Sequence, residues 1–133
     1  MAISDRQKLI LLVEDDVDLV QLVTRWLERE GYRVRTVVSG HAALEALAAD
    51  PLPNLVLLDV MIPHVSGFDI LRRVRTDART RTLPVVMMTG LTREKDVKRG
   101  RLLGANDYIV KPLSELDFLE RVAHALGNPR TAG

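Results

Sequence analysis

Chemically active side chains follow four short apolar runs of this 133-residue chain. Glu14 and Asp15 follow the first run, and Asp59, Thr89 and Lys111 follow three later ones. If each run is a strand of one parallel sheet, these groups meet at one edge, because open parallel sheets carry their sites at the carboxyl ends of the strands. The sequence therefore predicts that three acids, a hydroxyl and an ammonium converge in one crevice.

Carboxylates held this close together need a cation. They repel one another and raise each other's pKa. Magnesium removes that cost, because it prefers oxygen ligands in an octahedron and keeps several waters. It also neutralises an incoming phosphoryl group, and a carboxylate nucleophile can form an acyl phosphate. Lys111 can pair with the phosphoryl charge, and the Thr89 hydroxyl can donate a hydrogen bond to it.

Each of these residues alone also has a plain structural explanation. Acids at strand ends are often turn residues or helix caps, and we favour the cap for Asp16, which stands where the first helix should begin. For Glu14 or Asp15 alone, cap and site are equally supported. Thr89 alone would be a strand or turn residue, and Lys111 a solvated lysine. The functional prediction therefore depends on the joint pattern.

Strand-like and helix-like segments alternate along the chain. Continuous apolar runs at 8–13, 54–58 and 83–88 predict buried parallel strands. Residues 33–37 alternate as an edge strand does, and 107–110 form a fifth candidate. This alternation predicts an α/β fold, with a parallel sheet covered by five helices on both faces.

The helices are predicted from apolar residues at three-to-four spacing. Gly31 ends the first helix and Ser39 caps the second. A helix at about 92–103 has a thin apolar face and contains Gly100, which costs about 1 kcal/mol relative to alanine, so we expect low local stability there. The other four are marked by Leu19, Leu22, Val23, Trp26 and Leu27; by Ala43, Leu44 and Leu47; by Phe68, Leu71 and Val74; and by Leu113, Leu116, Leu119, Val122 and Leu126.

Length and composition restrict the organisation and the function classes. We expect a single domain at 8–126, an N-terminal extension at 1–7 and a flexible tail at 127–133. The polar start, the lack of a membrane-length apolar run and the lack of cysteine favour a cytoplasmic protein without membrane contact. Balanced charge (19 basic, 18 acidic residues) and 4% aromatic residues give no support for direct nucleic-acid binding.

Taken in order, the motifs around the active groups resemble the receiver domain of two-component response regulators. The resemblance covers about 8–126, and its spacing agrees: 44 residues from Asp15 to Asp59, 30 more to Thr89 and 22 more to Lys111. It implies a doubly wound, flavodoxin-like sheet with strand order 2-1-3-4-5. The motifs are Val13-Glu14-Asp15-Asp16, Leu58-Asp59-Val60-Met61-Ile62-Pro63, Met88-Thr89-Gly90, Gly104-Ala105-Asn106-Asp107-Tyr108 and Tyr108-Ile109-Val110-Lys111-Pro112.

The resemblance implies a phosphorylation site that depends on magnesium. Asp59 would accept the phosphoryl group. Asp15 and Asp59 would bind Mg²⁺ together with the backbone carbonyl of Met61, and Glu14 would contribute through a water molecule. The domain would catalyse its own phosphorylation and dephosphorylation and no other reaction.

The resemblance also implies a switch. Thr89 would move toward the phosphoryl group, Lys111 would contact it, and Tyr108 would turn inward; for Tyr108 alone, a half-buried strand position is the plain explanation. The peptide bond from Lys111 to Pro112 would be cis. The surface of the helix at 92–103, the fifth strand and the last helix would then control a downstream protein.

The implied partners are a sensor histidine kinase or a histidine phosphotransfer protein as phosphodonor, and a downstream protein target. A phosphorylation-dependent homodimer stays open, as does the choice between a stand-alone regulator and a piece of a larger one. Histidine kinase activity is disfavoured, because His41 and His124 are expected on helix surfaces and His64 in a loop.

Four residues distinguish this chain within the family pattern. Ser66 stands where an aspartate often precedes the glycine, and the small Gly90 should leave the site open to a donor. Met61 and Leu91 occupy positions that flank the path of the attacking water in the family. Both are apolar and neither can orient that water, so we hypothesise a long-lived phosphoaspartate.

Two basic clusters invite other interpretations. A solvated helix face is the plain one; contact with nucleic acid and pairing of arginines with an acidic partner protein are the alternatives. The first cluster is Arg93, Lys95, Lys98, Arg99 and Arg101, and the second is Arg72, Arg73, Arg75, Arg79 and Arg81.

Three other functions compete with the receiver. A flavin-binding electron-transfer protein would need a phosphate-cradling loop after the first strand, where this chain has three acids at 14–16. A phosphatase with an aspartate nucleophile would need a general acid where Met61 stands. A receiver that only binds partners would not need the intact acids, Thr89 and Lys111.

Overall fold

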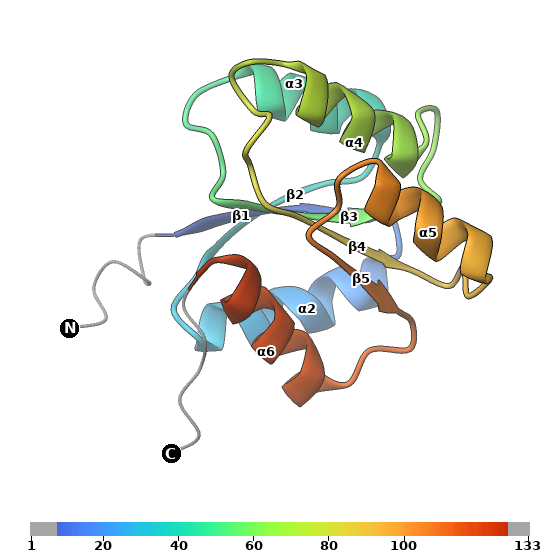
Figure 1. Cartoon of the computed structure of the whole chain (residues 1–133). Helices are drawn as coiled ribbons and strands as arrows, with labels where there is room; N and C mark the ends of the chain where they lie inside the picture. The colour runs from blue at the N-terminus through green and yellow to red at the C-terminus, as the bar shows by residue number, and fades with distance from the viewer. Residues whose placement is uncertain (1–7, 128–133) are drawn as a thin grey trace.

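The computed structural model describes residues 8–127, which form one parallel sheet with helices on both faces (Figure 1). The strands are β1 (Leu9–Val13), β2 (Arg33–Val37), β3 (Leu55–Asp59), β4 (Val85–Thr89) and β5 (Asp107–Val110). The helices are α2 (Val17–Arg29), α3 (Gly40–Ala48), α4 (Gly67–Thr76), α5 (Glu94–Leu102) and α6 (Glu115–Ala125). The predicted extension at 1–7, and the predicted tail beyond Gly127, lie outside the described residues.

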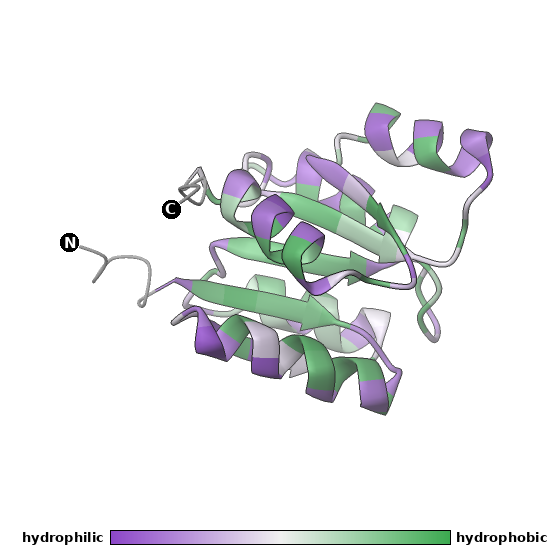
Figure 2. Cartoon of the chain, turned by 90° about the horizontal axis from the view of Figure 1, so that it is seen from below, coloured by the Kyte–Doolittle hydropathy of each residue, from purple (hydrophilic) through white to green (hydrophobic). Residues whose placement is uncertain are grey.

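The strands are all parallel, in the order β2-β1-β3-β4-β5. This confirms the doubly wound, flavodoxin-like order. Helices α2 and α6 cover one face, and α3, α4 and α5 cover the other (Figure 1). Strands β1, β3 and β4 are buried along their whole length, whereas the edge strand β2 is largely exposed. Figure 2 shows the apolar strands between helices whose outer sides are polar.

The alternation of side chains along each central strand divides the core into two clusters. In β1, Leu11 and Val13 pack with α3 and α4, while Ile10 and Leu12 pack with α2 and α6. Burial on both faces explains the continuous apolar runs, since a parallel strand covered twice has no solvent-facing side. Within residues 8–127, no helix combines the length and the apolar character needed to cross a membrane.

Helix ends follow the predicted signals. The Asp16 side chain accepts hydrogen bonds from the backbone N–H groups of Asp18 and Leu19 (3.0 and 3.2 Å), which confirms it as the cap of α2. Ser39 caps α3 in the same way, through the N–H of Ala42. Gly31 follows α2 with a φ of 93°, a left-handed conformation that glycine adopts at little cost.

The apolar face of α6 differs from the prediction. Leu116 is predicted in the core but is 62% exposed, whereas Phe118, which the predicted apolar face did not include, is fully buried. Phe118 packs against Trp26 of α2, with ring centroids 5.7 Å apart. Helix α6 could turn either Leu116 or Phe118 toward the sheet. It buries Phe118, because burying the aromatic ring removes more apolar area from water than burying a leucine does.

Helix α5 is weakly packed, as expected. Gly100 is its only buried residue, and its N-cap, Arg93, makes no side-chain capping bond. A Cβ at position 100 would lie 3.0 Å from the Tyr108 ring and 3.3 Å from the Met87 sulfur. The glycine therefore allows α5 to lie directly against β5.

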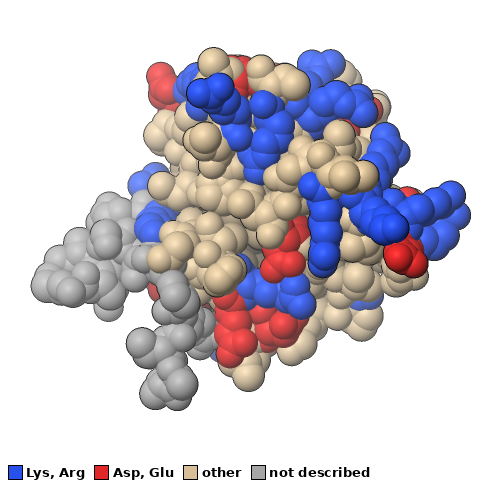
Figure 3. Space-filling view, viewed as in Figure 1, with Lys and Arg blue, Asp and Glu red and all other residues tan. Residues whose placement is uncertain are grey.

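The interpretation of the two basic clusters as solvated surface is wrong for Arg75. Most of their members are exposed, as on a solvated face, and Figure 3 shows Lys and Arg gathered over the side of α4 and α5. Arg75, however, is partly buried and donates to the carbonyls of Leu83 (2.6 Å) and Gly104 (2.9 Å) and to the Asn106 side chain (2.9 Å). Its pKa is lowered by burial. Arg75 therefore holds the fold together and is not free to meet a partner.

Arg79 is a second arginine with a structural role. It donates to the carbonyls of Leu47 (2.8 Å) and Ala49 (3.0 Å), at the end of α3, and pairs with Asp50. The clustering of arginines after Phe68 thus reflects in part the ties between α4 and its neighbours.

Candidate functional site

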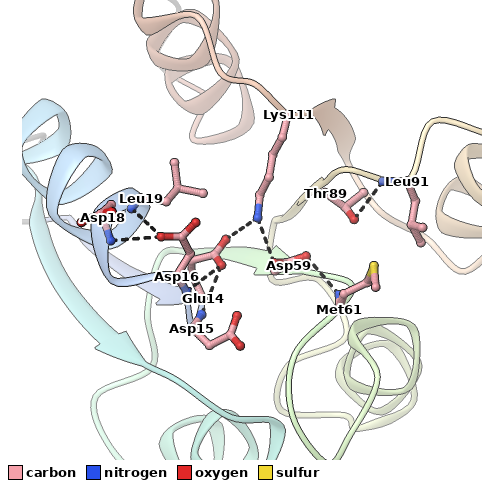
Figure 4. Close-up of polar contacts among 10 residues, drawn as sticks. All are labelled: Glu14, Asp15, Asp16, Asp18, Leu19, Asp59, Met61, Thr89, Leu91 and Lys111. Atoms are coloured by element: carbon pink, nitrogen blue, oxygen red, sulfur yellow. Dashed lines mark hydrogen bonds and ion pairs between the residues drawn. The ribbon is translucent and has the colours of Figure 1, made fainter.

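The three predicted acids meet at the carboxyl ends of β1 and β3. Glu14 and Asp59 are buried, at 1% and 4% exposure, and Asp15 is exposed. One carboxylate oxygen from each lies within 4.8 Å of the other two. Asp59 is the last residue of β3, and Glu14 directly follows β1, so the pairing of β1 with β3 brings them together (Figure 4).

Lys111 bridges two of these acids from the loop that follows β5. Its Nζ donates to Glu14 Oε1 at 2.8 Å and to Asp59 Oδ2 at 2.9 Å. Burial lowers the pKa of this ammonium, but the hydrogen bonds and negative charges of both acids outweigh burial, and the pKa lies above its ordinary value. Lys111 is therefore firmly charged. The peptide bond between Lys111 and Pro112 is cis, the isomer that the family resemblance implied.

Backbone N–H groups fix the remaining oxygens of the two buried acids. Glu14 Oε2 accepts from the N–H of Asp15 (3.2 Å) and of Asp16 (3.1 Å), and Asp59 Oδ1 accepts from the N–H of Met61 (3.0 Å). Burial raises the pKa of Glu14; the hydrogen bonds from Lys111 and Asp16 oppose this without cancelling it. These hydrogen bonds hold the two buried carboxylates in place, whereas Asp15 is exposed.

Thr89 and Tyr108 both contact the backbone of Leu91. The Thr89 hydroxyl, at the end of β4, accepts from the N–H of Leu91 at 3.3 Å, and the Tyr108 hydroxyl donates to its carbonyl at 3.3 Å. Tyr108 is buried, not half-buried, and burial raises its pKa, with smaller contributions from the charges of Asp96 and Asp59. One residue of backbone therefore links the two predicted switch residues, and this link has no signal in the sequence.

A further residue that the sequence did not mark is Gly67. It begins α4, and a Cβ there would overlap the Asp59 carbonyl oxygen and lie 2.7 Å from Val60 Cα. Its N–H donates to the Val60 carbonyl at 2.9 Å. Ser66, which the sequence marked only as standing where an aspartate often does, caps α4 by accepting from the N–H of Phe68 at 3.2 Å. These two residues hold α4 against the strand that carries Asp59.

Comparison with known proteins decides the family. Residues 10–123 match the response regulator receiver domain. The chain belongs to this family. It carries the acidic cluster of a phosphorylation site, Glu14, Asp15 and Asp59, and its function is that of a two-component receiver. The match begins at the second residue of β1, includes the four other strands in full and ends within α6.

Relatives and solved structures agree with this assignment. The receiver is 41% identical over 113 residues to the DNA-binding dual master transcriptional regulator RpaA of Synechocystis sp. PCC 6803, covering 85% of this chain and 46% of RpaA. It resembles the crystal structure of a putative response regulator from Chloroflexus aurantiacus, with a TM-score of 0.86, 32% identity, and coverage of 91% of this chain and 98% of the other. The chain spans half or less of the length of the curated relatives it matches.

A third relative contains a metal. The receiver domain of sensor histidine kinase PA1611 from Pseudomonas aeruginosa PAO1 was solved with a magnesium ion coordinated in its active site cleft; it has a TM-score of 0.82 and 26% identity, and the match covers 91% of this chain and 98% of the other. The donors in the present receiver suit the same kind of ion. All three grouped side chains offer carboxylate oxygens, the ligands that magnesium prefers. The exposed Asp15 gives an ion access to the buried pair.

Proposed function

We propose that this receiver accepts a phosphoryl group on Asp59 in a reaction that requires magnesium. The observation that carries the proposal is the position of the Asp59 carboxylate, buried at a strand end and held by Lys111 on one oxygen and by the Met61 N–H on the other. In the step, a carboxylate oxygen of Asp59 forms a bond to phosphorus while the bond from phosphorus to the donor breaks. The product is an acyl phosphate.

The metal site in this proposal consists of Asp15, Asp59, the backbone carbonyl of Met61 and, through water, Glu14. Magnesium bound there supplies positive charge that neutralises the phosphoryl oxygens. The fit of three carboxylates within 4.8 Å of one another supports this assignment. Lys111 already neutralises part of their charge through Glu14 and Asp59, and a magnesium ion would supply the rest.

The proposed conformational switch starts from the negative charges that phosphorylation adds to Asp59. A phosphoryl group on Asp59 adds nearly two negative charges and strong acceptor oxygens. These oxygens offer a new acceptor to the Lys111 ammonium, which is now bound to Glu14 and Asp59, and to the Thr89 hydroxyl. If Thr89 turns toward it, the hydrogen bond from the Leu91 N–H is released. Because Tyr108 holds the other side of Leu91, the change passes to α5 and β5.

We further propose the biological setting. The phosphodonor is a sensor histidine kinase or a histidine phosphotransfer protein, and the output is control of a downstream protein through the surface of α5, β5 and α6. A cysteine-free composition is compatible with a cytoplasmic location. The receiver catalyses its own phosphorylation and dephosphorylation and no other reaction.

Phosphorylation by a small donor tests the central proposal. The protein is incubated with magnesium and acetyl phosphate, and its intact mass is recorded beside Asp59→Asn. We expect one phosphoryl adduct on the wild type, none without magnesium, and none on the variant. An adduct of equal yield on Asp59→Asn would overturn the assignment of Asp59.

Decay of that adduct tests the predicted long lifetime. Met61 is 65% exposed and Leu91 is partly buried, and neither side chain can orient an attacking water. We expect Met61→Asn to shorten the half-life of the phosphorylated protein at least about tenfold, because a polar side chain there can orient the attacking water; a fully positioned acid or base contributes about 10²–10⁴-fold. Leu91→Val, which stays apolar, is the matched control. Decay of the wild type within seconds would contradict the hypothesis.

A further inference from the structure

Two histidines meet at the surface beside the phosphorylation site. His41 lies in the first turn of α3, and His64 lies in the loop between β3 and α4. Their ring centroids are 5.5 Å apart with the planes inclined by 36°, and both residues are exposed. We propose that His41 and His64 form a binding site for a divalent transition-metal ion of the zinc, nickel and copper class, separate from the acidic cluster.

The spacing of the rings suits a shared ion. An ion about 2.0–2.1 Å from one nitrogen of each imidazole lies about 3.2 Å from each ring centre. Two centroids 5.5 Å apart then subtend an angle of about 120° at the ion, close to the roughly tetrahedral angle of zinc sites. Both side chains are exposed, so their rings are free to rotate and turn one nitrogen each toward a shared ion.

The backbone at His64 adds an independent observation. Its φ is 75°, and among residues 8–127 it is the only residue other than glycine with a positive φ. Such a conformation costs an L-residue roughly 1 kcal/mol or more, and it persists where the surroundings impose it. Strain of this kind concentrates at ligand sites and switches. The side chain that His64 carries lies beside the His41 ring of α3.

Backbone contacts hold the two histidines in register. The N–H of Gly40, beside His41, donates to the carbonyl of Pro63, beside His64, at 3.3 Å. A Cβ at Gly40 would overlap the Val65 side chain and lie 2.8 Å from the Val65 carbonyl oxygen. The start of α3 therefore lies directly against the loop, and the meeting of the rings depends on backbone contacts as well as on side-chain rotamers.

The donor types separate this site from the acidic one. Imidazole nitrogens suit zinc, copper and nickel, whereas carboxylate and carbonyl oxygens suit magnesium. In the described part of the chain, the three acids are the only group of three or more potential metal-binding side chains. The histidine pair thus supplies two ligands, and water completes the coordination. An ion there would tie α3 to the loop that also carries Met61.

Nickel binding tests the proposal. The full chain without a histidine tag is stripped of metal and titrated with Ni²⁺ by calorimetry in excess Mg²⁺, which occupies the acidic cluster. We expect one site in the wild type, and at least about tenfold weaker binding in both His41→Asn and His64→Asn. His124→Asn, at an exposed position of α6, is the matched control and should bind as the wild type does.

Two further measurements separate the outcomes. Asp15→Asn should keep its nickel affinity, and the spectrum of bound Cu²⁺ should show coupling to two imidazole nitrogens that falls to one in His64→Asn. The proposal is overturned if His64→Asn binds nickel as tightly as the wild type. It is also overturned if Asp15→Asn loses the nickel site, because the ion would then belong to the acidic cluster.

Discussion

Helices α4 and α5 cover the same face of the sheet but are held in opposite ways. Half of α4 is buried, Ser66 caps its start, and Arg75 ties its end to the loops before β4 and β5. Helix α5 buries one glycine and lacks a side-chain cap. Its further contacts are made by Val97, which packs partly buried against the core, and by Arg99, whose guanidinium lies 4.4 Å from the centre of the Phe68 ring.

The difference in packing between α4 and α5 matches the two needs of the proposed switch, a fixed acceptor and a helix that can move. Asp59 needs a fixed environment, and α4 provides it by packing its first residue against the Asp59 carbonyl. A moving element needs few buried contacts, since local opening is cheapest where little apolar surface is lost. In the proposed switch, the same face of the sheet would supply both, with α4 as the fixed helix and α5 as the moving one.

Alanine substitutions at one glycine of each helix should show the largest difference in stability between α4 and α5. Gly67→Ala should lower the free energy of unfolding by roughly 3 kcal/mol or more, because the new Cβ meets backbone atoms that cannot move aside. Gly100→Ala meets the Tyr108 ring and the Met87 side chain instead, and gains about 1 kcal/mol of helix propensity. The free energy of unfolding of Gly100→Ala should therefore stay close to that of the wild type. Urea denaturation of both variants measures the difference, and equal losses would break the proposed contrast.

Two arginines give the second contrast. Arg75→Met keeps the aliphatic stem but leaves the carbonyls of Leu83 and Gly104 without their donor, at a cost of about 2 kcal/mol. Arg99→Met loses only the stacking on Phe68, worth about 0.5–1 kcal/mol. Thermal unfolding of the two variants tests this ranking. If Arg99→Met lost more stability than Arg75→Met, α5 would be held more firmly than its few buried residues indicate.

Helix caps give the smallest effects. Ser66→Ala should cost about 1 kcal/mol by removing the cap of α4. Arg93→Ser should add a cap to α5, where Arg93 has cap geometry but makes no capping bond, and gain about 0.5 kcal/mol after loss of the exposed Asp96 pair. Amide hydrogen exchange should slow in α5 of Arg93→Ser and become faster in the first turn of α4 of Ser66→Ala. Unchanged exchange in α5 would mean that its start is not the point where it opens.

Much of the fold could be predicted because its signals are local. Buried parallel strands require continuous apolar runs, and Asp16, Gly31 and Ser39 mark helix ends through contacts two or three residues away. Leu116 shows the limit. Two apolar stripes overlap on α6, and which one is buried depends on the fit of Phe118 against Trp26, a residue far away in the sequence.

The site was predictable to the extent that strand ends determine it. Parallel pairing of β1 with β3 brings Glu14 and Asp59 together, and Lys111 follows β5 at the same edge of the sheet and reaches both acids. The contacts of Arg75 could not be predicted, because its partners are backbone carbonyls, which every residue carries, and one of them is 29 residues away. The meeting of His41 with His64 has the same cause, since it depends on how a loop packs against α3.

The hydrogen bond from Lys111 to Glu14 spans 97 residues. Closing a loop of that length has an entropic cost that only later contacts repay, so the bridge forms once the last strand has joined the sheet. During synthesis, a chain that still lacks β5 already contains Asp59 but not the ammonium that holds it. A kinase would therefore meet a complete acceptor only on chains whose sheet is finished, and phosphorylation would be confined to folded molecules without any separate checkpoint.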